Sequence, residues 1–325
     1  MLCRIFALRC SRVAWVLSLL LGTMFGPSAF GQTANPNQVA ILRWYAANTA
    51  VSFKFTGYTF GMAFDGANIW ILSSSNSITK MRASDNAVLG VFSTGNYPIG
   101  AAFDGANIWV ANYADNTVMK LRASDGALVG TFPVGQNPSD LAFDGANIWV
   151  VNHAANTLTK LRATDGSNLG TFSLSGTLYG ITFDGVNIWV GQVTGGTVSK
   201  IRTSDGAILG TYYAQSNPTA LCFDGTNVWI TNENNKGTVV RMRPSDGTIL
   251  GVYGVGSYPG QYPTGIAYDG VYIWVANYGG GSVSKLRASD GASFGTFPVT
   301  SPGPMAFDGA NMWVSDIYDW TVFKM

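Results

Sequence analysis

The sequence contains little charge and few of the residues that most often carry out catalysis. Only 11% of its 325 residues are charged, and it has one histidine, His153, and one glutamate, Glu233. A lone histidine cannot build the histidine clusters that hold catalytic transition metals. No glycine-rich phosphate loop opens a helix, and the spacing supports no Ser-His-Asp set. We therefore expect no cofactor and no metal site, and favour a binding protein over an enzyme.

The first 31 residues predict a secretory signal peptide. Three arginines accompany an apolar run from Val13 to about Phe25, and the small residues Ala29 and Gly31 stand at positions −3 and −1 of a cleavage site before Gln32. The run is shorter than the roughly 20 residues that span a bilayer, so an uncleaved anchor is the less favoured alternative. We expect an exported protein, periplasmic or extracellular, with no membrane span in the mature chain.

Cysteine is equally scarce. Cys3 and Cys10 belong to the predicted signal peptide, which leaves Cys222 alone in residues 32–325. The mature chain can therefore form no internal disulfide. Because Cys222 follows a leucine in an apolar strand, we interpret it as a small buried hydrophobic residue.

Residues 32–325 are dominated by an internal repeat. Phe-Asp-Gly, once as Tyr-Asp-Gly, occurs seven times at spacings of 39 to 45 residues, each followed by a tryptophan. The seven tryptophans are Trp70, Trp109, Trp149, Trp189, Trp229, Trp274 and Trp313. A period of 40–45 residues is typical of four-stranded propeller blades. Helical repeats need longer amphipathic runs than the Gly, Pro and Asn breaks allow.

One repeat predicts four strands, a to d, over 99–103, 107–111, 117–123 and 127–132. Asp-Gly follows strands a and c, and this pair favours tight hairpin turns. We predict an all-β fold, a seven-bladed β-propeller of four-stranded antiparallel blades over residues 32–325.

The last repeat lacks its strand d. Ala40-Ile-Leu-Arg-Trp-Tyr45 resembles the strand d copy Ala207-Ile-Leu-Gly-Thr-Tyr212. We therefore expect an N-terminal strand to close the last blade, which would leave no open end in the series of blades.

Two stretches, Trp109-Val-Ala-Asn112 and Trp274-Val-Ala-Asn277, resemble the Tyr-Val-Thr-Asn signature of the YVTN-type β-propeller repeat family. NHL-type propellers and streptogramin lyases are more distantly similar in blade rhythm. The YVTN resemblance implies an exported, surface or periplasmic propeller, and many members have no known activity. The lyases imply an alternative, a lyase or hydrolase at the channel mouth, but they use paired His and Glu residues.

The repeats also carry most of the charge, as Lys-x-Arg in strand c and aspartates in the turns. After residue 31, 16 basic and 18 acidic groups remain. A net acidic domain does not favour nucleic acid, so we expect no nucleic-acid partner. We interpret the Lys-x-Arg rows as a structural ladder that pairs with the repeated aspartates between blades. A polyanion-binding surface is the alternative.

Divergence between the repeats predicts where a ligand binds. Both Asp-Gly turns fall on one face of the ring, which we call the Asp-Gly face, and it is nearly uniform. The b–c and d–a loops form the opposite face, the loop face, and they vary in sequence. Recognition is expected where a repeat scaffold diverges and is exposed.

We expect this loop face to bind a peptide, glycan or protein, with a purely structural envelope protein as a further alternative. The candidate binding residues are Tyr97, Tyr113, Asp115, Asp140, His153, Tyr179, Glu233, Tyr258, Tyr262, Tyr278, Asp316 and Trp320. Asp316 and Asp319 could act as a carboxylate pair, or with Glu233 as Ca²⁺ ligands, but we interpret them as solvated loop acids.

Overall fold

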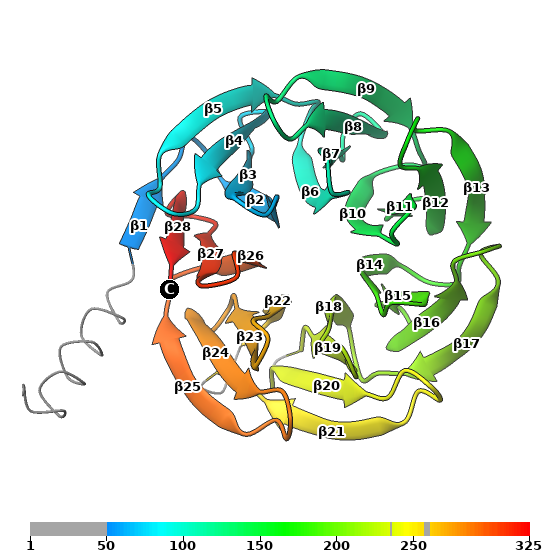
Figure 1. Cartoon of the computed structure of the whole chain (residues 1–325). Coiled ribbons are helices and arrows are strands. Elements are labelled where there is room, and N and C mark those ends of the chain that lie inside the picture. The colour runs from blue at the N-terminus through cyan, green and yellow to red at the C-terminus, as the bar shows by residue number, and fades with distance from the viewer. Residues whose placement is uncertain (1–50, 235, 257–260) are drawn as a thin grey trace, which may run out of the picture. The chain divides into compact units, whose positions relative to one another are not determined.

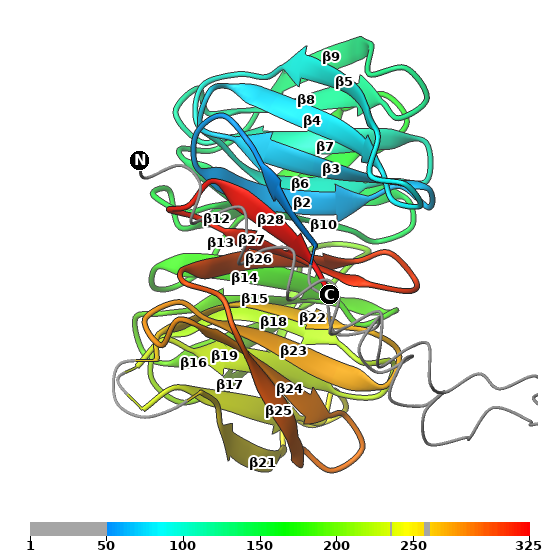
Figure 2. The same cartoon turned by 90° about the vertical axis from the view of Figure 1, so that its left-hand side faces the viewer.

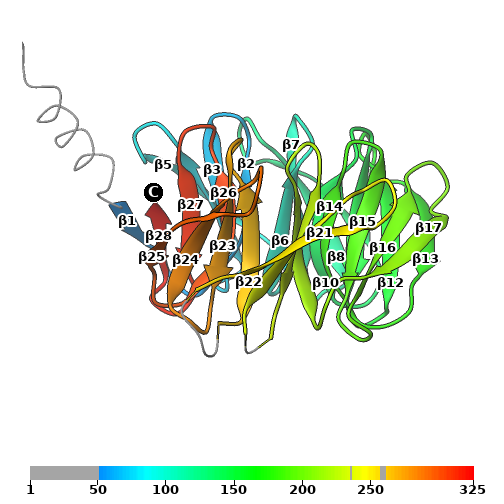
Figure 3. The same ribbon diagram turned by 90° about the horizontal axis from the view of Figure 1, so that it is seen from below.

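The computed structural model describes residues 51–325 except 235 and 257–260, and these residues form a seven-bladed β-propeller (Figure 1). Each blade is a four-stranded antiparallel sheet whose strand a lies innermost. Figure 2 and Figure 3 show the ring edge-on, with its turns and loops on two opposite faces. The described residues contain no helix long and apolar enough to cross a membrane.

The strands of the blades follow the chain. Blades 1 to 3 are β2 Thr59–Phe64, β3 Asn68–Ser73, β4 Ser77–Arg82, β5 Val88–Ser93; β6 Pro98–Phe103, β7 Asn107–Asn112, β8 Thr117–Arg122, β9 Leu128–Pro133; and β10 Pro138–Phe143, β11 Asn147–Asn152, β12 Thr157–Arg162, β13 Asn168–Ser173. Blades 4 and 5 are β14 Leu178–Phe183, β15 Asn187–Gln192, β16 Thr197–Arg202, β17 Ile208–Tyr213; and β18 Pro218–Phe223, β19 Val228–Asn232, β20 Thr238–Met242, β21 Ile249–Gly254. Blades 6 and 7 are β22 Pro263–Tyr268, β23 Tyr272–Asn277, β24 Ser282–Arg287, β25 Ser293–Pro298; and β26 Pro302–Phe307, β27 Met312–Asp316, β28 Thr321–Lys324, β1 Val51–Lys54.

An N-terminal strand does complete blade 7, but it is not the predicted one. Strand β1 pairs antiparallel with β28, from Val51 opposite Lys324 to Lys54 opposite Thr321. Phe53 stacks on Trp313 with ring centroids 5.8 Å apart, as a strand d aromatic does in the other blades. The strand d position is thus filled by 51–54, and the predicted segment 40–45 lies outside the described residues.

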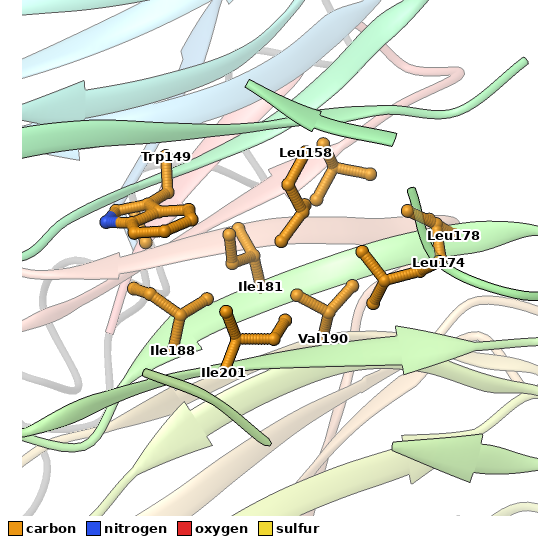
Figure 4. Close-up of a cluster of buried hydrophobic side chains, with 10 residues drawn as sticks. Trp149, Leu158, Leu174, Leu178, Ile181, Ile188, Val190 and Ile201 are labelled. Carbon is orange, nitrogen blue, oxygen red and sulfur yellow. The ribbon is translucent and has the colours of Figure 1, made fainter. Parts of the chain in front are cut away.

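Apolar side chains fill the space between neighbouring blades. Between blades 3 and 4, Trp149 and Leu158 pack with Ile188, Val190 and Ile201 (Figure 4). A similar cluster joins blade 7 to blade 1, so the core continues around the ring. The tryptophan of each repeat is therefore a packing residue, and six of the seven are fully buried.

The Lys-x-Arg rows are structural, but the predicted pairing with aspartates between blades is wrong. Arg122 pairs with Asp125 of its own blade at 2.9 Å, and both side chains are exposed. Lys120 is buried and donates to the carbonyl oxygen of Ala163 in the next blade at 2.6 Å. The aspartate of the a–b turn has another partner, since Asp104 accepts the indole N–H of Trp109 at 2.7 Å.

Glycines in strand a bring the inner strands close together around the channel. A Cβ atom at Gly100 would meet the carbonyl oxygen of Ser139 in the next blade, and one at Gly180 would meet that of Thr219. Both contacts would be with backbone that cannot move away easily, so glycine is required for this close approach.

Candidate functional site

The inner strands enclose a cavity of about 590 Å³ on the axis of the ring. Every blade contributes to its lining through strand a, at positions that differ from repeat to repeat. The second residues of the seven strands a are Phe60, Ile99, Ser139, Tyr179, Thr219, Thr264 and Gly303. All but Gly303 line the cavity, so its wall differs from blade to blade although the backbone repeats.

Aromatic side chains surround the mouth of this cavity on the loop face. We call them the aromatic collar: Tyr58, Phe60, Tyr97, Tyr113, Tyr179, Tyr278, Tyr318 and Trp320. They come from strand a, from b–c loops and from d–a loops of different blades. Phe60, Tyr97, Tyr179 and Tyr278 also line the cavity itself. The collar therefore links the exposed loops to the channel.

The collar residues hold one another by edge and hydrogen-bond contacts. Tyr97 lies 5.1 Å from Phe60 and 5.8 Å from Tyr113, measured between ring centroids. The Tyr278 hydroxyl donates to the Tyr318 hydroxyl at 2.8 Å. Tyr97 nevertheless keeps 47% of its surface exposed and Tyr318 keeps 57%. These rings are ordered by neighbours and still offer area for contact.

Glu233 lies at the mouth between two of these tyrosines. Burial raises the pKa of its carboxyl. Burial also raises the pKa of Tyr179, with a further contribution from the Glu233 charge. The hydrogen bond with Tyr318 raises the pKa of Tyr278 to about 12, and burial, the Tyr318 charge and the Glu233 charge add to it. Glu233 of blade 5 is thus electrostatically coupled to tyrosines of blades 4 and 6.

Asp140 places a second carboxylate deeper, on strand β10. The other six blades have Gly, Ala or Pro at this position of strand a. Its carboxylate accepts the amide of Leu141 at 2.9 Å and that of Ile181, in the next blade, at 3.2 Å. Burial raises its pKa to about 6, although the two amides oppose the shift. A carboxylate in a cavity whose pKa is raised by burial is a candidate for a functional group.

Besides the collar residue Trp320, the structure gathers seven of the candidate residues at or near the mouth. These are Tyr97, Tyr113, Asp140, His153, Tyr179, Glu233 and Tyr278. His153 sits edge-on against Tyr179 at 4.7 Å, and its Nδ1 lies 2.7 Å from the Leu178 carbonyl oxygen. Because a carbonyl can only accept, Nδ1 carries the proton, and the imidazole orients the tyrosine.

Other candidates take part in loop structure. Asp115 accepts the backbone and side-chain amides of Asn96 at 2.7 and 2.8 Å, which ties a d–a loop to a b–c loop. Asp316 is not the solvated loop acid that we expected, because it is buried at the end of strand β27 and accepts the amides of Thr300 and Asp319 at 3.1 and 3.3 Å. No three His, Cys, Asp or Glu side chains lie close enough to hold a metal ion within the described part of the chain.

The remaining candidates lie at the rim or outside the description. Trp320 contacts Tyr58 in the collar at 6.1 Å, and Tyr262 is 38% exposed but does not line the cavity. Tyr258 lies outside the described residues. Sequence reasoning missed Tyr58, Phe60 and Tyr318 as site residues. Comparing the second position of each strand a would have indicated Phe60, since it varies as a ligand-facing position does.

Comparison with known proteins supports the fold. Neither a protein-family model nor a curated protein sequence matches the chain. Among solved structures, Kuenenia stuttgartiensis hydrazine synthase is similar with a TM-score of 0.73 and 17% identity, over 86% of this chain and 97% of that one. A streptogramin B lyase structure is similar with a TM-score of 0.73 and 16% identity, over 85% and 96%. The chain is thus a seven-bladed β-propeller, similar in fold to these two proteins.

Proposed function

We propose that this protein is an exported, non-enzymatic binding propeller that takes its ligand in the aromatic collar at the mouth of the channel. One observation supports this most strongly: the collar and the cavity are built at positions where the repeats diverge. Rings that packed only for stability would be expected to repeat with the blades, as the buried tryptophans do.

The size and composition of the site agree with a small ligand or an extended side chain. A cavity of about 590 Å³ falls within the range usual for small-molecule sites. Tyrosines around an apolar cavity provide contact area at a low cost in conformational entropy. A peptide, glycan or protein could therefore insert one group into the channel while its remainder contacts the loops.

A lyase or hydrolase acting at the same mouth is the second candidate. The raised pKa of Asp140, about 6, would suit a general acid or base at neutral pH. One of the similar structures is titled a streptogramin B lyase, but at 16% identity this likeness concerns the fold. Hydrolytic turnover of a ligand once it is found, lost in Asp140→Asn, would favour this candidate.

A ligand screen with matched variants tests the proposed function. The purified protein is screened by thermal shift against oligosaccharides, peptides, cell-wall fragments and amines. The site variant combines Tyr179→Ala with Tyr278→Ala. The control is Val186→Ala, since Val186 is 67% exposed in an a–b turn on the Asp-Gly face, where four other blades carry alanine.

We expect a ligand that raises the Tm of the parent and of Val186→Ala but not that of the collar variant. A ligand that stabilises all three proteins equally would show that binding lies elsewhere. No stabilisation by any compound would contradict a small-ligand site and favour a structural role.

A further inference from the structure

The charges around the cavity have one sign. Its lining includes the carboxylates of Asp140 and Glu233, and no lysine, arginine or histidine among the described residues. The repeated carboxylates of the turns have evident partners, such as the arginines of strand c or the indole N–H groups. A low-dielectric cavity with two acids and no base attracts cations and repels anions.

Glu233 is held in place by its backbone, while its carboxylate pairs with no group of the residues that the structure describes. Its amide donates to the Asn217 carbonyl oxygen at 2.8 Å, and the Asn217 side chain donates to the Glu233 carbonyl oxygen at 3.1 Å. Within the described part of the chain, no group donates to the carboxylate or forms an ion pair with it. No other blade has an acidic residue at this position. The corresponding residues are Ser74, Tyr113, His153, Val193, Tyr278 and Ile317. The repeat structure therefore does not require an acid here, and Glu233 is a specific feature of the cavity mouth.

The neighbours of this carboxylate are suited to a cation with an apolar stem. Tyr179 and Tyr278 line the cavity mouth together with Glu233. An ammonium group is stabilised both by an ion pair with a carboxylate and by cation–π contact with tyrosine rings. Farther along strand a the lining is apolar, with Ile181, Ile266 and Met305. A methylene chain would lie against these residues, and Asp140 would face a second amine.

We propose that the mouth binds an aliphatic ammonium group, with Glu233 as its counter-ion and the tyrosines of blades 4 and 6 around it. This inference rests on the proposed function, because it names the ligand class of the same site. The amine could belong to a free diamine or polyamine, or to a lysine side chain of a peptide. The two sources present the same ammonium group at the mouth and differ only at the far end of the methylene chain.

Calorimetric titration with isosteric probes tests the charge requirement. The probes are 1,5-diaminopentane, its neutral isostere 1,5-pentanediol and Nα-acetyl-lysine-N-methylamide, titrated into the parent protein, Glu233→Gln and Val186→Ala. We expect the diamine to bind at least about tenfold more tightly than the diol, the difference expected when one partly desolvated ion pair is lost. Glu233→Gln should reduce that difference with an unchanged Tm, while Val186→Ala should retain it in full.

The outcomes separate this inference from the proposed function. If the diol binds as tightly as the diamine, or if Glu233→Gln binds both as the parent does, the ammonium site is overturned while a collar ligand is retained. If neither amine binds but a neutral compound gives a collar-dependent shift in the screen, only this inference fails. Tighter binding of the diamine indicates a free amine, and tighter binding of the lysine derivative indicates a peptide.

Discussion

The ammonium group of Lys120 joins two blades, because it donates to the carbonyl oxygen of Ala163 at 2.6 Å while lying 5.1 Å from the ring centroid of Trp109. The lysines of blades 1, 3 and 4 make the same contact, and Lys324 donates to Ala83 and so links blade 7 to blade 1. Blade 5 has Arg241 at this position, and in blade 6 Lys285 lies 3.8 Å from Asp269 of its own blade. The lysines that donate to the next blade therefore stabilise the interfaces between blades.

Replacing Lys120 should destabilise the fold far more than replacing its neighbour Arg122. Lys120→Met leaves the carbonyls of Ala163 and Thr164 without their donor and should lower the free energy of unfolding by about 1–3 kcal/mol. Arg122→Gln removes an exposed ion pair and should change it little. Urea denaturation of both variants checks this. Equal losses would mean that the lysine contributes no more than a surface charge.

Two turn glycines in blade 2 separate steric crowding from backbone strain. Gly126 has a φ of +76°, and a Cβ atom there would clash with ring carbons of Phe92 in blade 1. Gly105 has a φ of +97°, and a Cβ atom there would meet nothing within 4 Å. Both alanine variants bear the strain of the left-handed region, about 1–2 kcal/mol. Gly126→Ala must also displace the ring, so we expect a clearly lower Tm for it than for Gly105→Ala.

Asp104 should stabilise the protein at neutral pH and lose this effect in acid. Burial opposes its ionisation, but hydrogen bonds from Trp109, Ala106 and Asn107 outweigh burial and hold the pKa below its ordinary value of 3.8. A lowered folded-state pKa contributes stability above the unfolded value, and this is lost as the pH falls through the folded value. Asp104→Asn should therefore cost about 1–3 kcal/mol at pH 7. The difference in the free energy of unfolding between the parent and Asp104→Asn should become smaller below about pH 3.8. Urea denaturation of both proteins at pH 7 and below pH 3.8 measures this difference.

Asp140 should show the opposite dependence. Because its folded-state pKa is about 6, above the ordinary value of 3.8, the folded protein binds more protons between these values and loses stability as the pH rises through them. Asp140→Asn lacks this titration. The stability of the parent relative to the variant should fall by about 1–3 kcal/mol between pH 4 and pH 7. A difference that is the same at both pH values would contradict the raised pKa.

The sequence predicts the blades well because the information is local. Phe-Asp-Gly, the tryptophan and the second Asp-Gly fix turns and buried positions in every repeat, and the strands end within one or two residues of the expected limits. The closing strand was harder to identify, because four residues carry little pattern. Val51-Ser-Phe53 shares only its aromatic with the other strands d, whereas 40–45 shares more letters with one copy.

The site could be predicted only in outline. Loop divergence predicts that Tyr97, Tyr179 and Glu233 lie together on the loop face, and in the structure all three line the cavity there. Counting charges could not show whether a lysine faces a carboxylate or a carbonyl. Asp140 is among the candidates expected on the loop face, but it lies on strand β10 and lines the channel. Its exceptional nature emerges only when the third residues of all seven strands a are aligned.

Blade 7 is the one blade whose four strands are not consecutive in the described chain, because β1 comes from its N-terminal end. Separating β1 from β28 would therefore open the ring and leave the other six sheets intact. Four residue pairs join these strands, whereas six join β11 and β12 within blade 3. The partners Val51 and Lys324 are also separated by nearly the whole described chain, so forming this pairing requires a large loss of loop entropy. During synthesis β1 remains unpaired until β28 has been made. Under mechanical load, we expect the pairing of β1 with β28 to break first.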